Sequence, residues 1–144
     1  MSTEESAGSE EYSAKDIAEK TIVGLTEEVI ISGNSGKKEL IARIDTGATK
    51  SSIDLTLASE LKLGPVIDSR LIKSAHGTKL RPVVKASVKI QNRNIKAKFT
   101  LADRSHLRYP VLIGQNILKM GFLVDPIRRV DKPIIGKTLV KQKK

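Results

Sequence analysis

The sequence contains no cysteine and no tryptophan, and aromatic residues make up only 3% of its 144 positions. The absence of cysteine excludes disulfides and thiolate metal sites and is compatible with an intracellular protein. So few aromatic side chains argue against a base-stacking platform for single-stranded nucleic acid. No apolar run approaches the roughly 20 residues that span a bilayer. The acidic, serine-rich start MSTEESAGSEEYSAKD does not resemble a signal peptide, so we expect a cytoplasmic protein without membrane partners.

Charge is distributed unevenly along the chain. Residues 1–20 contain six acidic and two basic side chains, a net charge of −4, whereas the whole chain carries +10. Residues 21–144 therefore carry +14 and are expected to attract polyanions, although a solvated lysine surface explains the charge equally well. We predict a disordered acidic tail at 1–20, one folded domain at 21–136 and a basic tail at 137–144.

Most of the predicted domain has the periodicity of β-strands. Residues 84–90 and 95–101 alternate apolar and polar side chains on either side of the turn QNRN. Weaker alternation at 39–44, and an Ile- and Val-rich stretch at 21–31 that ends in the loop SGNSGKK, predict two more strands. A period of two with a polar outer face indicates a half-buried antiparallel sheet.

Two short helices are predicted among these strands. One begins at an N-cap on Asp54 and runs through Leu61, and the other follows Gly114 and stops at Gly121. The pattern as a whole predicts an all-β fold, a small barrel or sandwich with one or two short helices.

The stretch IARIDTGATKSSI, residues 41–53, contains the tripeptide Asp45-Thr46-Gly47 between two apolar segments. These residue types are ordinary turn formers, and the tripeptide occurs by chance in roughly a few per cent of chains of this length. A loop supported by a strand on each side is also where a catalytic carboxylate is well held. The tripeptide alone is therefore compatible with either use.

Two further stretches accompany this tripeptide. KSAHGTKLRPVV, residues 73–84, has a small turn between extended arms and predicts a projecting β-hairpin. YPVLIGQNIL, residues 109–118, is an apolar run that ends at Gly114 and opens a helix. A glycine at that place lets another part of the backbone approach closely.

In this order the segments resemble the retropepsin-like aspartic proteases. The resemblance extends from about residue 39 to residue 124, and it includes the apolar-apolar-Gly signature Leu112-Ile113-Gly114. More narrowly, the sequence is similar to a prokaryotic branch commonly named ATP-dependent zinc proteases. Members of that branch are frequently encoded beside, or fused to, ATP-grasp ligases of the glutamate-adding type.

The resemblance implies a single-lobe retropepsin-like barrel with aspartic endopeptidase activity, Asp45 as the catalytic residue and no cofactor. Peptide hydrolysis by this route requires two carboxyl groups, one to activate water and one to protonate the carbonyl oxygen. The chain has one DTG tripeptide. The active site would therefore require a homodimer in which Asp45 of each subunit contributes to a dyad on the twofold axis.

The resemblance also assigns roles to the neighbouring residues. The active-site loop would continue through Thr46, Gly47 and Ala48, with structural support from Leu112, Ile113 and Gly114. The hairpin would close over a peptide substrate as a flap, with substrate contacts from Ala75, His76 and Gly77. The basic domain and the glutamate-ligase association suggest an acidic or glutamate-rich peptide or protein substrate.

Two other function classes remain open. A metal-dependent hydrolase would need three or four ligands, whereas the chain has only two histidines, His76 and His106, which are 30 residues apart. A catalytically silent retropepsin-fold module would instead dock on RNA or an acidic protein, with nucleic acid the less favoured partner. Arg81 and Arg104 are expected to pair with carboxylates and hold loops rather than to bind substrate.

The identity of residue 48 leads to a prediction about pH. Ala48 follows the retroviral pattern, whereas two-lobed pepsins usually have a hydroxyl residue there, and the loss of that donor disfavours the charged form of the dyad. We predict that peptide hydrolysis has its optimum at a less acidic pH than in pepsin-like enzymes. A pH–rate profile measures this, and a maximum near pH ~2 would contradict it.

Overall fold

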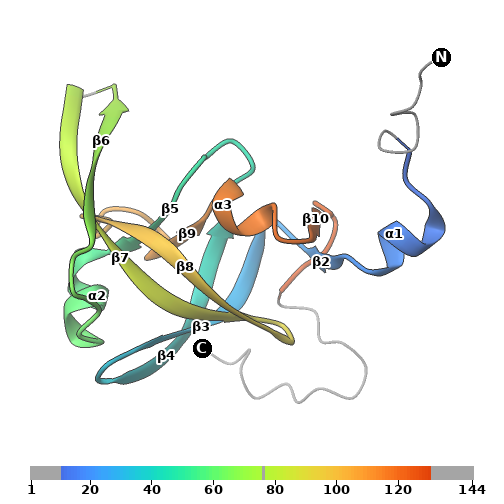
Figure 1. Ribbon diagram of the computed structural model, residues 1–144, viewed down its shortest axis with the longest axis horizontal. Helices are drawn as coiled ribbons and strands as arrows, with labels where there is room; N and C mark the ends of the chain where they lie inside the picture. Colours follow the sequence, from blue (N-terminus) through green and yellow to red (C-terminus); the bar gives the residue numbers. More distant parts are fainter. Residues whose placement is uncertain (1–10, 76, 131–144) are drawn as a thin grey trace.

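The computed structural model of the protein describes residues 11–75 and 77–130 (Figure 1). The predicted basic tail at 137–144 lies outside these ranges. The elements, in chain order, are α1 (Ala14–Ala18), β2 (Thr21–Val23), β3 (Thr26–Gly33), β4 (Gly36–Ile44), β5 (Ser51–Asp54), α2 (Leu55–Glu60), β6 (Asp68–Ser74), β7 (Gly77–Ile90), β8 (Arg93–Ala102), β9 (Val111–Ile113), α3 (Gln115–Leu118) and β10 (Phe122–Val124). Strands predominate and the helices are short, which confirms the predicted fold class.

Six of the strands form a closed barrel. The order around it is β3, β4, β9, β5, β8 and β7, and a further pairing of β7 with β3 completes the ring. Each of these strands therefore has a hydrogen-bonded neighbour on both sides. Most pairs are antiparallel, as predicted, but β4–β9 and β5–β8 are parallel. Alternation shows which side chains are buried and not the direction of the neighbouring strand, so it does not reveal parallel pairs.

The barrel interior is filled by the side chains that the alternation selects. In β7, Val84, Ala86, Val88 and Ile90 are all buried, and Phe99 of β8 is completely inaccessible. The lysines between the buried residues of β7 are exposed. Burying one large apolar side chain contributes about 1.5–3 kcal/mol, so this periodic pattern accounts for much of the stability of the barrel.

The strand predicted at 21–31 is two strands in the structure, β2 and β3, with Gly24 at the break. A Cβ atom at Gly24 would lie 2.4 Å from the carbonyl oxygen of Arg128, so a side chain here would collide with another part of the backbone. The loop predicted at SGNSGKK is also shorter than expected. β3 and β4 stay paired as far as Gly33 and Gly36, which leaves a tight turn between them.

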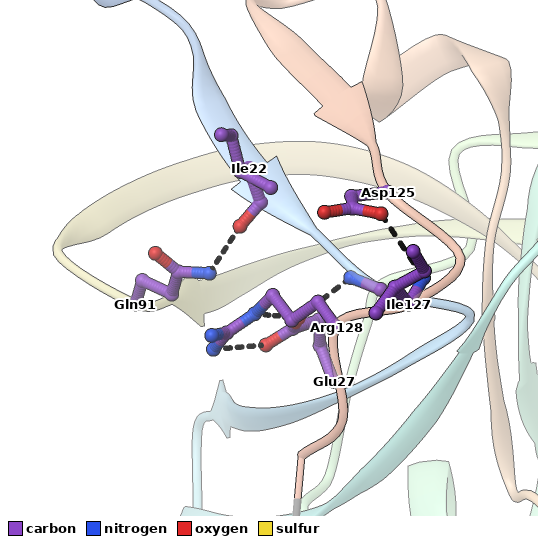
Figure 2. Close-up of polar contacts among 7 residues, drawn as sticks. Ile22, Glu27, Gln91, Asp125, Ile127 and Arg128 are labelled. Atoms are coloured by element: carbon purple, nitrogen blue, oxygen red, sulfur yellow. Dashed lines mark hydrogen bonds and ion pairs between the residues drawn. The ribbon is translucent and has the colours of Figure 1, made fainter. Parts of the chain in front are cut away.

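A buried ion pair attaches the segment after β10 to the start of β3 (Figure 2). The side chain of Glu27 is 2% exposed and accepts hydrogen bonds from the Nε and Nη2 atoms of Arg128, at 2.7 and 3.3 Å. The same carboxylate accepts the backbone N–H of Gly24 at 2.8 Å. Beside it, the Gln91 side chain donates to the carbonyl oxygen of Ile22 at 2.6 Å. Strand β2 and the segment after β10, which are far apart in sequence, are thus held to the barrel by neighbouring contacts.

Both predicted helices are present. The Asp54 side chain caps α2 by accepting a backbone N–H of its first turn, and α3 begins directly after Gly114. The structure has a further short helix, α1, inside the segment predicted as an acidic tail, where Ser13 and Asp16 form a capping box. No helix in the described ranges is long and apolar enough to cross a membrane.

The predicted hairpin is formed by β6 and the first half of β7. The two strands pair in antiparallel register from Asp68 and Val83 at the base to Ser74 and Gly77 at the tip. Beyond Val83, β7 also pairs with β8, whereas from Gly77 to Pro82 β6 is its one strand partner in the described chain. The hairpin therefore projects from the barrel as a two-stranded ribbon (Figure 1).

We predict that Arg128→Met destabilises the fold by about 3 kcal/mol, because breaking a buried ion pair on one side leaves an uncompensated charge. The carboxylate of Glu27 would remain buried without the guanidinium that now binds it. The free energy of unfolding from a urea titration measures the loss.

Lys38→Met is a matched control for this measurement. Lys38 and Glu60 form an ion pair at 3.7 Å, but both side chains are more than half exposed. Pairs of that kind contribute about 0–1 kcal/mol. Equal losses of stability in the two variants would contradict the prediction, because they would show that burial does not increase the contribution of the Glu27–Arg128 pair.

Candidate active site

Asp45 lies directly after the end of β4. Its backbone N–H donates to the carbonyl oxygen of Ile113 at 2.9 Å, next to the parallel register of β4 and β9. Ile113 is fully buried and Ile44 is nearly so. The position of Asp45 is therefore set by two core strands, and its half-buried side chain lies outside the barrel interior.

The carboxylate of Asp45 is held by its own loop. Its Oδ1 atom accepts the backbone N–H of Gly47 at 2.9 Å, and its carbonyl oxygen accepts the N–H of Ala48 at 3.3 Å. This is the side-chain turn for which aspartate is favoured. A Cβ atom at Gly47 would lie 3.3 Å from Oδ1 and would crowd that oxygen. Among the described residues, Oδ2 has no hydrogen-bond partner.

Helix α3 braces the loop from the side. The backbone N–H groups of Gln115 and Asn116 donate to the carbonyl oxygens of Ala48 and Thr49, at 2.7 and 3.3 Å. The Gln115 side chain also donates to the carbonyl oxygen of Thr46 at 2.7 Å. These bonds satisfy carbonyls that a projecting loop would otherwise leave to solvent, and they fix the loop relative to the barrel.

Gly114 allows this contact to be close. A Cβ atom there would lie 2.2 Å from the carbonyl oxygen of Lys50 and 2.8 Å from that of Ala48. The backbone N–H of Gly114 donates to the hydroxyl of Ser51 at 2.9 Å, and that hydroxyl donates to the side chain of Asn116 at 2.7 Å. The close backbone approach that a glycine was expected to permit at this position is present in the structure.

The tip of the β6–β7 hairpin contains Ala75 and Gly77, two of the three residues predicted to contact substrate. Gly77 has a φ of +109°, a backbone conformation that favours glycine. His76 lies outside the described residues. Leu71 and Leu80 face each other across the hairpin, and both are about two-thirds exposed, at 68% and 67%. One face of the hairpin thus presents apolar surface to solvent.

Within the described residues, Arg104 and Arg81 do not form the carboxylate ion pairs predicted for them. The Nε atom of Arg104 donates to the carbonyl oxygen of Tyr109 at 3.0 Å, and Nη1 donates to the hydroxyl of Ser52 at 3.1 Å. Asp54 accepts the backbone N–H of Arg104 at 2.8 Å and not its side chain. Neither guanidinium forms an ion pair within the described part of the chain.

Electrostatic influences connect Arg104 with the candidate catalytic residue. Burial lowers the pKa of the Arg104 guanidinium below its ordinary value, and the positive charge of Arg81 acts in the same direction. The negative charges of Asp54 and Asp45 oppose this shift. Arg104, on the loop between β8 and β9, therefore lies within electrostatic reach of both Asp45 and the hairpin.

A basic cleft of about 270 Å³ lies beside the loop, over β7 and β8. Asp45 does not line this cleft, but Ser51 does, so the cleft borders the segment that follows the DTG tripeptide. Its cationic lining residues are Lys50, Arg70, Lys85, Lys96 and Lys98.

Metal ligands are not grouped in the described chain. No three His, Cys, Asp or Glu side chains there are close enough together to hold one ion. His106 is exposed on the loop between β8 and β9.

Three polar residues that brace the site were not identified from the sequence: Ser51, Gln115 and Asn116. For Ser51 the available signal was the pair of serines in a short strand next to an apolar residue. A buried hydroxyl needs a hydrogen-bond partner, so such a serine indicates a bracing contact. For the two amide side chains no local pattern was informative, since their partners lie from 18 to 69 residues away in sequence.

Solved structures with the same fold include two from different sources. A protein of unknown function from Legionella pneumophila is 21% identical, with a TM-score of 0.51, over 74% of this chain and 93% of that one. EIAV protease, in complex with the inhibitor HBY-793, is 24% identical, with a TM-score of 0.54, over 66% of this chain and 85% of that one. At these identities the similarity shows a shared retropepsin-like fold and no more.

A curated relative is similar over most of the chain. It is a probable alpha-L-glutamate ligase from Desulfotalea psychrophila, 25% identical over 159 residues, which cover 90% of this chain and 34% of the ligase. This chain therefore spans about a third of the length of that relative.

One family model matches residues 57–133, just over half of the chain, and its description is "Retropepsin-like aspartic endopeptidase RimB". The matched region includes the hairpin, β9 and α3 but begins after the DTG tripeptide. It agrees with the barrel topology and with the resemblance found in the sequence. The chain belongs to the RimB-like family of retropepsin-like aspartic endopeptidases.

Proposed function

We propose that this protein is an aspartic endopeptidase that acts as a homodimer, with Asp45 of each subunit forming a catalytic dyad. The observation that carries the proposal is the state of the Asp45 carboxylate. One of its oxygens is fixed by Gly47, and the other has no partner among the described residues. A rigidly held carboxylate with a free oxygen is suited to binding and activating a water molecule.

The reaction requires two such carboxyl groups about 3 Å apart, which cannot both ionise and therefore share a proton. The ionised carboxylate removes a proton from water as the water oxygen adds to the peptide carbonyl carbon. The protonated carboxyl group donates its proton to the carbonyl oxygen. Collapse of the tetrahedral intermediate breaks the C–N bond, and a proton passes to the leaving nitrogen.

The need for a second chain follows from the single DTG tripeptide in the sequence. Within the described chain, the hydrogen-bond partner of the Asp45 carboxylate is the backbone N–H of Gly47, and no second carboxyl group is bonded to it. A twofold axis beside the loop would bring Asp45 and its copy together. Thr46, which is exposed in one chain, would then meet the same loop of the partner.

The β6–β7 hairpin is proposed to act as the flap. It is a two-stranded ribbon beyond the barrel, and its exposed leucine pair offers apolar surface that a bound peptide or a second subunit would cover. Closure would exclude water and hold the substrate in an extended conformation, as in other strand-addition complexes.

The proposed substrate is an acidic, glutamate-rich peptide segment. Residues 21–144 carry a net charge of +14, which favours association with polyanions. The basic cleft beside the loop supports this choice. So does the similarity to a probable alpha-L-glutamate ligase, because that protein's name refers to the addition of glutamate.

A second candidate is a retropepsin-fold binding module without turnover. The family match begins after Asp45, so the match itself does not include the residue on which catalysis would depend. Such a module would use the same basic surface to dock on RNA or an acidic protein. It predicts a stable monomer, steeply salt-dependent binding and no cleavage of any peptide.

We predict that Asp45→Asn lowers kcat/KM for a glutamate-rich peptide at least ~100-fold, because it removes an acid–base group while leaving the fold intact. The Oδ1 atom of asparagine still accepts the N–H of Gly47, so the loop should keep its conformation. Peptide cleavage followed by mass spectrometry measures the rate, and sedimentation equilibrium measures the subunit number.

Asp125→Asn is the matched control. Asp125 accepts the N–H of Ile127 at 3.0 Å in the same kind of turn, but it follows β10 and is not part of the loop after β4. Activity that survives in Asp45→Asn, or falls equally in both variants, would overturn the proposed mechanism. A monomeric wild-type protein that cleaves nothing would favour the binding module.

A further inference from the structure

Two half-buried arginines, Arg104 and Arg81, have no ion-pair partner in the described chain. Arg104 lies on the loop between β8 and β9, and Arg81 lies at the base of the hairpin. Neither forms an ion pair within the described residues, and both are only partly accessible. Removing a charge from water without a partner costs free energy, so such a pair is suited to an anion supplied from outside the chain.

The guanidinium of Arg104 is already oriented. Its Nε atom is fixed by the carbonyl oxygen of Tyr109 and its Nη1 atom by the hydroxyl of Ser52. Ser52 is itself 8% exposed and belongs to β5, the strand that follows the DTG loop. The Nη2 atom has no hydrogen-bond partner in the described part of the chain. A planar fork held at two points keeps its remaining donors pre-organised for a carboxylate.

Arg81 approaches the same place from the hairpin. Side chains two residues apart on a strand share a face, so Arg81 lies on the side of β7 that carries Val83, which is buried against β8. The side chain of Arg81 has no hydrogen bond in the described chain, yet its charge acts on Arg104. The loop of Arg104 runs at the base of the hairpin (Figure 1).

We infer that Arg104 and Arg81 together form a carboxylate-binding subsite beside Asp45, which selects an acidic side chain of the peptide next to the bond that is cut. This inference deepens the proposed function and rests on it. A bound carboxylate would be attracted to both guanidinium groups and would offset their mutual repulsion. The acid preference would then come from these two positions and not from the overall positive charge.

The same residues also explain why an amide would be rejected. A glutamine side chain has the shape of glutamate, but it offers one acceptor oxygen and no charge. Binding it would leave two half-buried guanidinium groups without a directly bonded carboxylate, and sites with unsatisfied polar groups discriminate strongly. Aspartate and glutamate would differ only in reach, so the subsite recognises the carboxylate.

The test compares two peptides of equal length, one with glutamates and one with glutamines at the same positions, at fixed ionic strength. The proteins are full-length wild type, Arg81→Gln, Arg104→Lys and the control Lys89→Gln. Lys89 is exposed on the same strand and loses the same charge as Arg81. Cleavage gives the ratio of kcat/KM values for the two peptides. Fluorescence anisotropy with labelled peptides, on wild type and in an Asp45→Asn background, gives the ratio of affinities without turnover.

We expect the preference for glutamate over glutamine to fall about tenfold in Arg81→Gln and in Arg104→Lys. It should change less than about twofold in Lys89→Gln, because that lysine acts only through weak, screened surface charge. Arg81→Gln removes no described hydrogen bond, so its fold should be retained, and thermal unfolding checks both arginine variants.

The outcomes separate the inference from the proposed function. If no peptide is cleaved, but wild type binds the glutamate peptide selectively and the arginine variants lose that selectivity, the subsite stands and the peptidase proposal fails. If cleavage occurs but Arg81→Gln keeps the wild-type ratio, or Lys89→Gln reduces it equally, the subsite is overturned and the peptidase proposal stands. Equal binding of both peptides by wild type also overturns the subsite.

Discussion

The close contact of Gly114 with the backbone of Lys50 is the constraint on which the candidate site depends. It allows α3 to reach the loop after β4, and the bonds from Gln115 and the Ser51 hydroxyl depend on that proximity. The φ of Gly114 is −107°, which any residue can adopt, so glycine is required here by space and not by conformation. A larger side chain would push apart the two segments that hold Asp45.

The fold was largely predictable because its signals are local. The alternation in β7 and β8, the Asp54 cap of α2 and the glycine before α3 each depend on residues close together in sequence. The position of Asp45 at a strand end was predictable for the same reason. Its catalytic role remains a proposal, because the second carboxylate that it needs does not belong to this chain.

What could not be predicted depends on contacts distant in sequence. The parallel pairs β4–β9 and β5–β8, and the hydroxyl network of Ser51, each join segments about 50 residues apart or more. The expected ion pair of Arg104 is absent from the described chain, where Asp54 accepts its backbone N–H and not its side chain. A pattern of charged residues in the sequence can indicate that an arginine and a carboxylate are neighbours. It does not show whether the carboxylate bonds the side chain or the backbone of the arginine.

β7 has a mechanical consequence for the site. It is 14 residues long and belongs to the barrel from Val83 onward and to the projecting ribbon before it, with Pro82 at the border. A rotation of the ribbon about this border carries its tip through a long arc but displaces Arg81 very little. The groups that would recognise an acidic side chain thus lie near the pivot. The ribbon could open for exchange of peptides without separating these groups.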